Sequence, residues 1–530
     1  MTTSPACEGC EHVEGKSDRL EGIASFLTPF LDSNEVPSEI NEALLRQNLQ
    51  IVRSRIAVLD RQCIATTPSA AHGELKELEY ELISVLSPLR RLPAEILAWI
   101  FLLSLKSRSC SEEDSDVERE LREYLDLFSN ARRGTGPWGL SWVCSRWRAV
   151  TLSTPSLWAR FSLKLPLCAP GDRVGNILYY DRGTLSLFNT AMERAGNHLL
   201  DFVFHMPPPS PISNDTFKRM LQVRQKWRHV YLVIPVHMWK IALEHNMHLP
   251  QLRTIGLRLL SEGDLGDVCI SAPNLVRVLL DAPNPYQYLN MPLNRVTHLE
   301  LYTSGSQLRN ILTRATHLRY LKLFGLYTND APDTSDEWMI HTSLEKLALS
   351  GSAMDGISSG IKLPSLTHLT LDGFHDPRHF IRTVADSLQS LTIHACIYPA
   401  DDAERLFSTA LNIKELQIQE WMHMEKHILE QLPFHLTPGH DHGNVVFLKR
   451  LERMKFFGSE CKTWPKAIFE PDGTLVKMIT SRTCSPLETG LAQLRELELI
   501  GRFEDFDASL RSLKKLETKD FVVKLQQVKY

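Results

Sequence analysis

The chain has 530 residues, of which 43% are hydrophobic and 23% charged, as expected for a folded globular protein with more than one core. Its formal net charge of −4 gives no electrostatic footprint for nucleic acid. The N-terminus lacks the apolar core of a secretion signal, and the longest apolar run, 96–103, is too short for a membrane span. We therefore expect an intracellular protein of the cytoplasm, the nucleus or both. We expect no nucleic-acid partner and no membrane partner.

The first ninety residues divide into a polar part and a helical part. Residues 1–40 are polar and rich in turn formers, and we expect a flexible leader there. Residues 41–90 contain two stretches, Leu45 to Leu59 and Leu75 to Leu89, with apolar residues at alternating spacings of three and four. Each stretch is too short for a free coiled coil, so we predict that the two helices fold back on each other as an antiparallel hairpin. The alternative is that the chain self-associates through the same apolar residues.

Three motifs follow between residues 91 and 161: LPAEIL at 92–97, VCSRWR at 143–148 and TPSLW at 154–158. Pro93 suits the first turn of a helix, and Glu95 then lies near the positive end of the helix dipole. The apolar residues that follow cover more than one face of that helix, so the helix must bury two sides. One side can face its own domain and the other a partner; the alternative is that both pack internally.

In this order the motifs resemble an F-box, with an insert at 106–137 that departs from the family's pattern. The insert contains the acidic stretch Ser111–Asp116, which predicts a solvated loop. Leader, hairpin and F-box in succession are similar to F-box proteins of mushroom-forming (basidiomycete) fungi. The resemblance implies docking on a Skp-type adaptor and, through it, on a cullin. By motif match the adaptor-binding residues would be Leu92, Pro93, Ile96, Leu97, Ile100, Val143 and Trp147.

A repeat organises the rest of the chain. The pattern L-x-x-L-x-L occurs eight times between 252 and 418, and its first positions lie 23, 21, 22, 26, 22, 22 and 25 residues apart. This interval is that of a leucine-rich repeat. Weaker copies begin at Leu199, Trp227, Leu451 and Leu494. We therefore predict an α/β solenoid: the helical hairpin and F-box helices are followed by an irregular leucine-rich-repeat domain at 162–505, and 506–530 forms a C-terminal cap and tail. Asp472-Gly473 predicts a hairpin turn within the domain.

The predicted strands define a candidate binding face. Successive side chains of a strand point to opposite faces, so the residues between buried leucines face solvent. Aromatic residues in a polar surround are typical of interface hot spots, although a solvated face without a partner is the alternative. The predicted target-binding residues are His298, Glu300, Tyr302, Tyr320, Lys322, Phe324, Lys346, His368, Thr370, Asp372 and His394.

Motifs that suggest chemistry are weak. Cys7 and Cys10 have metal-ligand spacing but no second pair, and G-x-G-x-x-G at 134–139 follows no predicted strand and carries a proline, so it predicts a turn. His423 and His427 lack the glutamate of a metalloprotease motif. His435, His440 and His442 are expected in a solvated loop. We therefore expect no enzyme activity, no cofactor and no metal.

These patterns together predict a substrate-recognition subunit of a Skp–cullin–F-box ubiquitin ligase. It would bind the adaptor through the F-box and a target protein, of unidentified nature, through the repeats. The alternative is a non-catalytic interaction scaffold with a degenerate F-box, which the insert and the diverged repeats favour.

Overall fold

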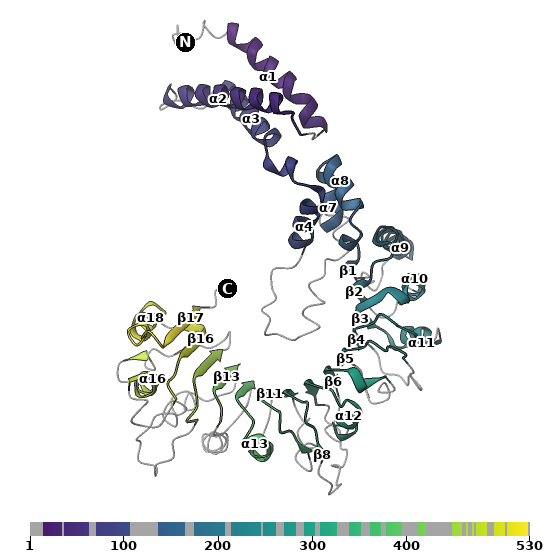
Figure 1. Cartoon of the computed structure of the whole chain (residues 1–530), viewed down its shortest axis with the longest axis vertical. Coiled ribbons are helices and arrows are strands. Elements are labelled where there is room, and N and C mark those ends of the chain that lie inside the picture. Colours follow the sequence, from purple (N-terminus) through teal and green to yellow (C-terminus); the bar gives the residue numbers. More distant parts are fainter. Residues whose placement is uncertain are drawn as a thin grey trace. The chain divides into compact units, whose positions relative to one another are not determined.

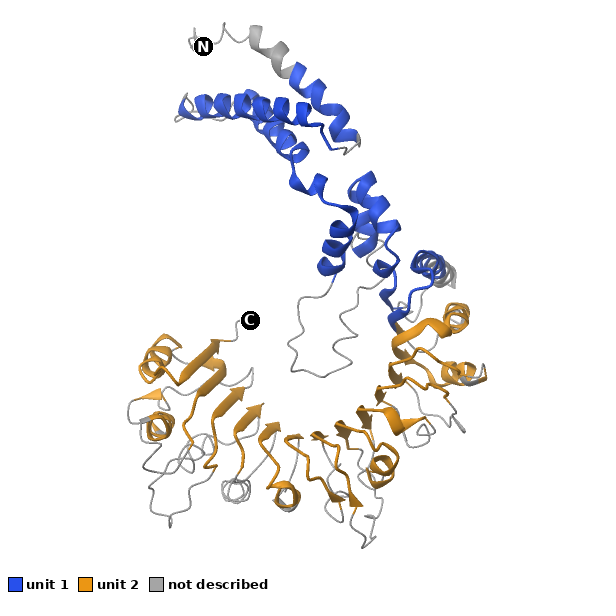
Figure 2. Ribbon diagram, in the orientation of Figure 1, with its two compact units in different colours: residues 1–165, 169–203 blue, residues 166–168, 204–530 orange. Residues whose placement is uncertain are grey.

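The structure is a computed structural model, in which the chain forms two compact units: residues 1–165 with 169–203 (unit 1) and residues 166–168 with 204–530 (unit 2), coloured separately in Figure 2. The boundary falls within one strand near residue 203, later than the predicted boundary at 161. The described residues are 14–33, 36–62, 70–105, 136–164, 174–206, 214–244, 247–260, 270–281, 291–302, 308–325, 339–350, 361–372, 378–394, 412–419, 448–457, 463–464, 469–470, 473–484, 492–503 and 506–527.

Unit 1 begins with three helices, α1 (Glu14–Ser33), α2 (Glu39–Gln62) and α3 (Ala70–Val85). Helices α2 and α3 run antiparallel, because Arg53 pairs with Glu79 at 2.7 Å while Asp60 contacts His72 at 2.8 Å. Apolar residues spaced three or four apart put one stripe of each helix into a common core. That core contains Ile23, Leu27, Leu45, Val52, Ile56, Leu75, Leu78, Leu82 and Val85.

Helix α1 occupies the segment for which a flexible leader was expected, and that expectation is wrong for its described part. Ile23 and Leu27 lie one turn apart and are buried in the three-helix core. Phe26, Phe30 and Leu31 pack against the same core, so α1 gains its stability from tertiary packing, which the average polarity of residues 1–40 hides.

The second half of unit 1 holds short helices, then a strand, a longer helix and a second strand. Residues 106–135, most of the predicted insert, lie outside the described residues. Trp158 and Phe161 pack against residues beyond position 180, which explains why unit 1 extends past the predicted boundary. The elements are η1 (Pro88–Arg91), α4 (Ala94–Ser104), α7 (Gly136–Val143), α8 (Ser145–Leu152), η2 (Pro155–Leu157), β1 (Arg160–Lys164), α9 (Val174–Ala195) and β2 (Leu200–His205).

Unit 2 is built on a long parallel sheet with helices along one side of it (Figure 1). In spatial order its strands are β3 (Trp227–Ile234), β4 (Thr254–Leu259), β5 (Arg277–Asp281), β6 (His298–Tyr302), β7 (Tyr320–Phe324), β9 (Lys346–Ser350), β11 (His368–Asp372), β12 (Ser390–His394), β13 (Glu415–Gln419), β14 (Arg453–Phe457) and β16 (Glu496–Phe503), which pairs with both β15 (Thr463–Trp464) and β17 (Val522–Gln527). The helices are α10 (Asn214–Gln222), α11 (Val236–Glu244), α12 (Leu308–Arg314), α13 (Arg378–Val384), α16 (Thr474–Cys484) and α18 (Phe506–Lys514), with short turns η3 (Arg224–Lys226) and η5 (Leu293–Arg295). A small separate pair consists of β8 (Met339–Ile340) and β10 (Ile361–Lys362).

The register of the sheet places equivalent repeat positions side by side. Leu369 pairs with Leu347 on one neighbour and with Leu391 on the other, and the same match recurs along the sheet. The leucines of each L-x-L are buried, and the residues between them point to the opposite face. Because a single repeat cannot bury its own leucines, stacking of repeats creates the core. Unit 2 is therefore an α/β solenoid-like fold.

Two predictions near the C-terminus are wrong. Thr474 begins helix α16, so the residues after Gly473 are helical and do not form the second strand of the predicted hairpin; Val476 and Ile479 are buried on one side of that helix. In the segment predicted as a C-terminal cap and tail, helix α18 is followed by strand β17 where a tail was expected, and Val523 of β17 is buried beside Leu497 of β16. The sheet thus continues one strand beyond the last predicted repeat.

Candidate functional site

Helix α4 presents two apolar faces. Leu97 and Phe101 are each 1% exposed and face the interior of unit 1. On the other side Trp99 is 63% exposed and Leu103 57% exposed, one turn apart, with Ile96 also in the open. Single exposed apolar residues are common on protein surfaces, whereas a contiguous stripe marks an interaction site. The exposed stripe of α4 is therefore a candidate protein-binding surface.

The inner face of α4 is fixed by helix α8. The rings of Phe101 and Trp147 pack at 4.7 Å between centroids. The Arg146 guanidinium donates hydrogen bonds to the backbone carbonyls of Arg90 and Leu92, which holds the segment leading into α4. The Cys144 thiol accepts from the Trp147 N–H and so caps the start of α8. The exposed stripe thus stands on a helix whose other side is locked in place.

Deeper in unit 1, aromatic rings support this helical group. Trp138 and Trp158 meet edge to face at 5.0 Å, and the Arg194 guanidinium lies over both rings, at 4.6 and 4.3 Å. The Trp158 indole N–H donates to the Thr151 carbonyl at 2.9 Å. Burial lowers the pKa of Arg194, and the electron-rich ring faces offset part of the loss of water.

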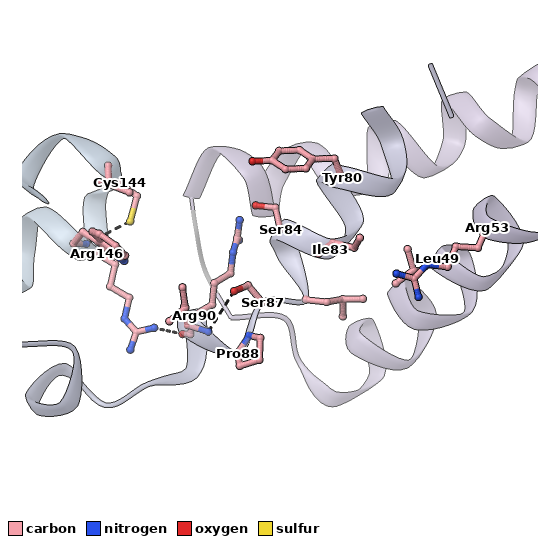
Figure 3. Close-up of a pocket in the computed structure, with 14 residues that line it drawn as sticks. Leu49, Arg53, Tyr80, Ile83, Ser84, Ser87, Pro88, Arg90, Cys144 and Arg146 are labelled. Carbon is pink, nitrogen blue, oxygen red and sulfur yellow. Dashed lines mark hydrogen bonds between the residues drawn. The ribbon is translucent and has the colours of Figure 1, made fainter. Parts of the chain in front are cut away.

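A groove of about 550 Å³ runs between the hairpin and the short helices of unit 1 (Figure 3). Tyr80, Ile83 and Leu49 line it from α2 and α3, and Val143 and Trp147 line it from the other side. The hairpin and the short helices therefore share one partly apolar surface within unit 1.

Charged groups tie the hairpin to the start of the α4 segment. Arg91 and Arg46 both form ion pairs with Glu42, and the hydrogen bond from Arg91 is the main reason that the pKa of Glu42 lies below its usual value. Arg90 donates to the Phe30 carbonyl at 2.7 Å, and burial lowers its pKa. These contacts bring α1, α2 and η1 together.

The seven residues predicted to bind an adaptor divide into two groups. Leu97 is a core residue, while Leu92 and Trp147 are half-buried and support the surface. Pro93, Ile96, Ile100 and Val143 are exposed. Sequence reasoning missed four further exposed apolar side chains, although the run 96–103 already carried too many apolar residues for one face. They are Trp99, Leu103, Trp142 and Leu152.

On the sheet of unit 2, the register gathers the predicted target-binding residues into rows. His298, Tyr320, Lys346 and His368 are direct neighbours along one edge. Further along the strands, the Tyr302 and Phe324 rings stack at 4.4 Å, and the Lys322 ammonium lies 4.7 Å from the Phe324 ring centre. Three further predicted residues, Thr370, Asp372 and His394, are half-buried.

Glu300 departs from the prediction. Its register position places it between Leu279 and Lys322 on the outward side, yet it is 2% exposed. Leu279, which occupies the equivalent position on β5, is buried as well. The central outward-facing side chains of β5 and β6 are therefore both covered. Glu300 is therefore not part of an open binding surface.

His298 lies in a positive field. Burial and then the charges of Arg277, Lys346 and Arg319 lower its pKa to about 4. Burial and Lys346 also lower the pKa of His368. Both imidazoles are consequently neutral at pH 7, and the positive charge at this edge comes from arginine and lysine.

In the described ranges, no three histidine, cysteine, aspartate or glutamate side chains are grouped so that they could hold a metal ion. None of the helices among these residues has the length and apolar character needed to cross a membrane. The candidate motifs at Cys7 and Cys10, at His423 and His427, and at His435, His440 and His442 lie outside the described residues.

No protein-family model matches the chain, and no curated protein matches it. Among solved structures, the chain is similar to one from the crystal structure of the Rad7 and Elc1 complex in yeast, with 13% sequence identity and a TM-score of 0.33. The likeness covers 78% of this chain and 98% of that chain. At this TM-score it carries no argument about fold or function.

Proposed function

We propose that the protein is the substrate-recognition subunit of a Skp–cullin–F-box ubiquitin ligase, an F-box protein with leucine-rich repeats similar to those of basidiomycete fungi. The observation that carries the proposal is the exposed stripe of α4. It lies on the helix that begins at the LPAEIL motif, next to the helices of the VCSRWR motif. An apolar stripe on a rigid support is what docking on another protein requires.

The two units would then have separate roles. The exposed residues Ile96, Trp99, Ile100 and Leu103 bind a Skp-type adaptor, and the adaptor links the chain to a cullin. The sheet of unit 2 binds the target protein. The chain contributes no nucleophile, and ubiquitin transfer follows from holding the target near a separately recruited conjugating enzyme. The place of action is the cytoplasm, the nucleus or both.

Co-purification with a Skp-type adaptor tests this proposal. We expect the full chain to capture the adaptor in stoichiometric amount, and the Ile96→Asp/Ile100→Asp variant to lose it, since two charges would have to enter an apolar interface. Both side chains are exposed in the free chain, so the variant should fold normally. Ile40→Asp is the matched control, because Ile40 is an equally apolar and exposed side chain on a different helix, α2.

Two results would refute the proposal. One is a folded wild-type chain that captures no adaptor. The other is capture that survives in the Ile96→Asp/Ile100→Asp variant. Tryptophan fluorescence and circular dichroism establish that each variant is folded, which separates loss of the surface from loss of the structure.

A further inference from the structure

Positive charge gathers at the edge of the sheet where strands β5 to β9 begin. Arg277, Arg295, Arg319 and Lys346 come from four successive repeats. In the described segments 270–277, 291–298, 314–320 and 339–346, Glu345 is the single carboxylate. Solvent-exposed charges of one sign at this density raise the local concentration of oppositely charged ligands.

Register brings these residues together although they are distant in the sequence. Arg277 lies beside His298, which lies beside Tyr320, which lies beside Lys346. Neighbouring strands are about 4.8 Å apart, so the row from Arg277 to Lys346 is roughly 14 Å long, the length of about four residues of an extended peptide. Arg319 comes directly before Tyr320 in the chain and so lies next to this row. Its guanidinium lies 3.9 Å from the Glu345 carboxylate.

A polar groove of about 460 Å³ follows the same edge. Arg295, His317 and Arg319 line it, together with Ser343 and the carboxylate of Glu345. The Ser343 hydroxyl already donates to the Thr316 carbonyl, so the donors that face the groove are the guanidinium groups. Carboxylates accept hydrogen bonds in pairs from arginine, and the groove is open to solvent on one side.

His298 in this row lies within the field of the same cations. Its pKa is lowered first by burial and then by Arg277, Lys346 and Arg319. Burial disfavours a charge of either sign, whereas the three cations disfavour a further positive charge and favour a negative one.

We propose that this basic edge, formed by Arg277, Arg295, Arg319 and Lys346, binds an extended acidic segment, rich in aspartate and glutamate, of a partner protein. The inference deepens the target-binding role proposed for unit 2 and names the chemistry of the target. Peptide binding is measured without an adaptor, so this inference and the ligase proposal fail independently.

The test uses the full chain and fluorescein-labelled peptides of alternating aspartate and serine, followed by fluorescence anisotropy. A peptide with asparagine in place of aspartate, and one with phosphoserine separated by asparagine, are the comparison probes. We expect the aspartate peptide to bind more tightly than the asparagine peptide and to weaken with added salt. Equal affinity for these two peptides, or binding of the phosphoserine peptide alone, would overturn the proposal.

Variants assign the binding to this edge. Arg295→Glu/Arg319→Glu should weaken the aspartate peptide at least about tenfold, since two charge-assisted contacts become repulsive. Arg382→Glu/Arg511→Glu changes the net charge equally on the exposed sides of α13 and α18 and should leave affinity unchanged.

A gain of affinity is expected from Glu345→Gln, roughly twofold to fivefold, because it removes the carboxylate that competes for Arg319. Misfolding cannot produce that gain. If the reversed-charge variant binds like wild type, or if Glu345→Gln weakens binding, the basic edge is not the site.

Discussion

Gly256 lies on the outward face of the sheet, under the ring of a tyrosine on the neighbouring strand. It pairs with Tyr231 on the adjacent strand, and the tyrosine ring lies flat over it. A Cβ added at Gly256 would lie 1.9 Å from Cδ2 and 2.6 Å from Cε2 of Tyr231. Both distances are well inside van der Waals contact, and Tyr231 is buried, so the ring has no open space to enter.

Two effects of Gly256→Ala oppose each other. Overpacking a filled site costs about 1–3 kcal/mol. The alanine restricts the unfolded chain, which stabilises by about 0.4–1 kcal/mol where the native backbone accepts it. The clash is with the ring carbons nearest the backbone, which move least, so overpacking should win. We expect a net loss of about 1–2 kcal/mol in the free energy of unfolding.

Urea unfolding of the full chain, followed by tryptophan fluorescence, measures this loss. Gly22→Ala is the matched control, because a Cβ at Gly22 in helix α1 meets nothing within 4 Å. That change should be neutral or stabilising. A double-mutant cycle then isolates the cause: in a Tyr231→Ala background, Gly256→Ala should no longer destabilise. If its cost is the same in both backgrounds, the contact with Tyr231 is not the reason and the argument fails.

Two further predictions concern other parts of the chain. Leu97→Ala should lower the free energy of unfolding by about 2–5 kcal/mol because Leu97 lies in the core of unit 1, whereas Ile96→Ala on the exposed side should change it by about 0.5 kcal/mol or less; equal losses in urea unfolding would contradict the two-faced description of α4. His298 has a pKa of about 4, against 6.5 for an ordinary histidine. Between these values the unfolded chain binds more protons, so stability falls as the pH drops from 6.5 toward 4. His298→Gln should make this fall in melting temperature shallower, and an unchanged pH profile would show that His298 does not cause it.

The repeat array could be predicted from the sequence because its signal is local and periodic. Leu321 and Leu323 are two apart and recur in the next repeat, so the strand, its buried side and its parallel neighbour follow from one pattern. The double apolar face of α4 was also visible as a run with too many apolar residues for one side. The sequence could not show which of the two faces would be buried inside unit 1. Leu97 and Trp99 are both apolar, and they differ only in which side chains from other segments lie beside them.

Other features depend on contacts that no local pattern carries. Helix α1 was missed because Ile23 and Leu27 gain their significance only from the apolar stripe of α3. The burial of Glu300 depends on flanking side chains from two other repeats. The basic edge was missed for the same reason: Arg295 and Arg319 are ordinary turn residues in the sequence, and only the register of the sheet makes them neighbours.

The uniform register of the parallel sheet has a consequence for how such a surface changes during evolution. From β3 to β14 each strand of the sheet pairs with one neighbour on either side, while its leucines maintain the stack. An outward residue of one repeat, such as Lys346 or Thr370, can therefore be replaced without disturbing repeats further along. Specificity for a new partner can be acquired one repeat at a time, with the fold intact at every step.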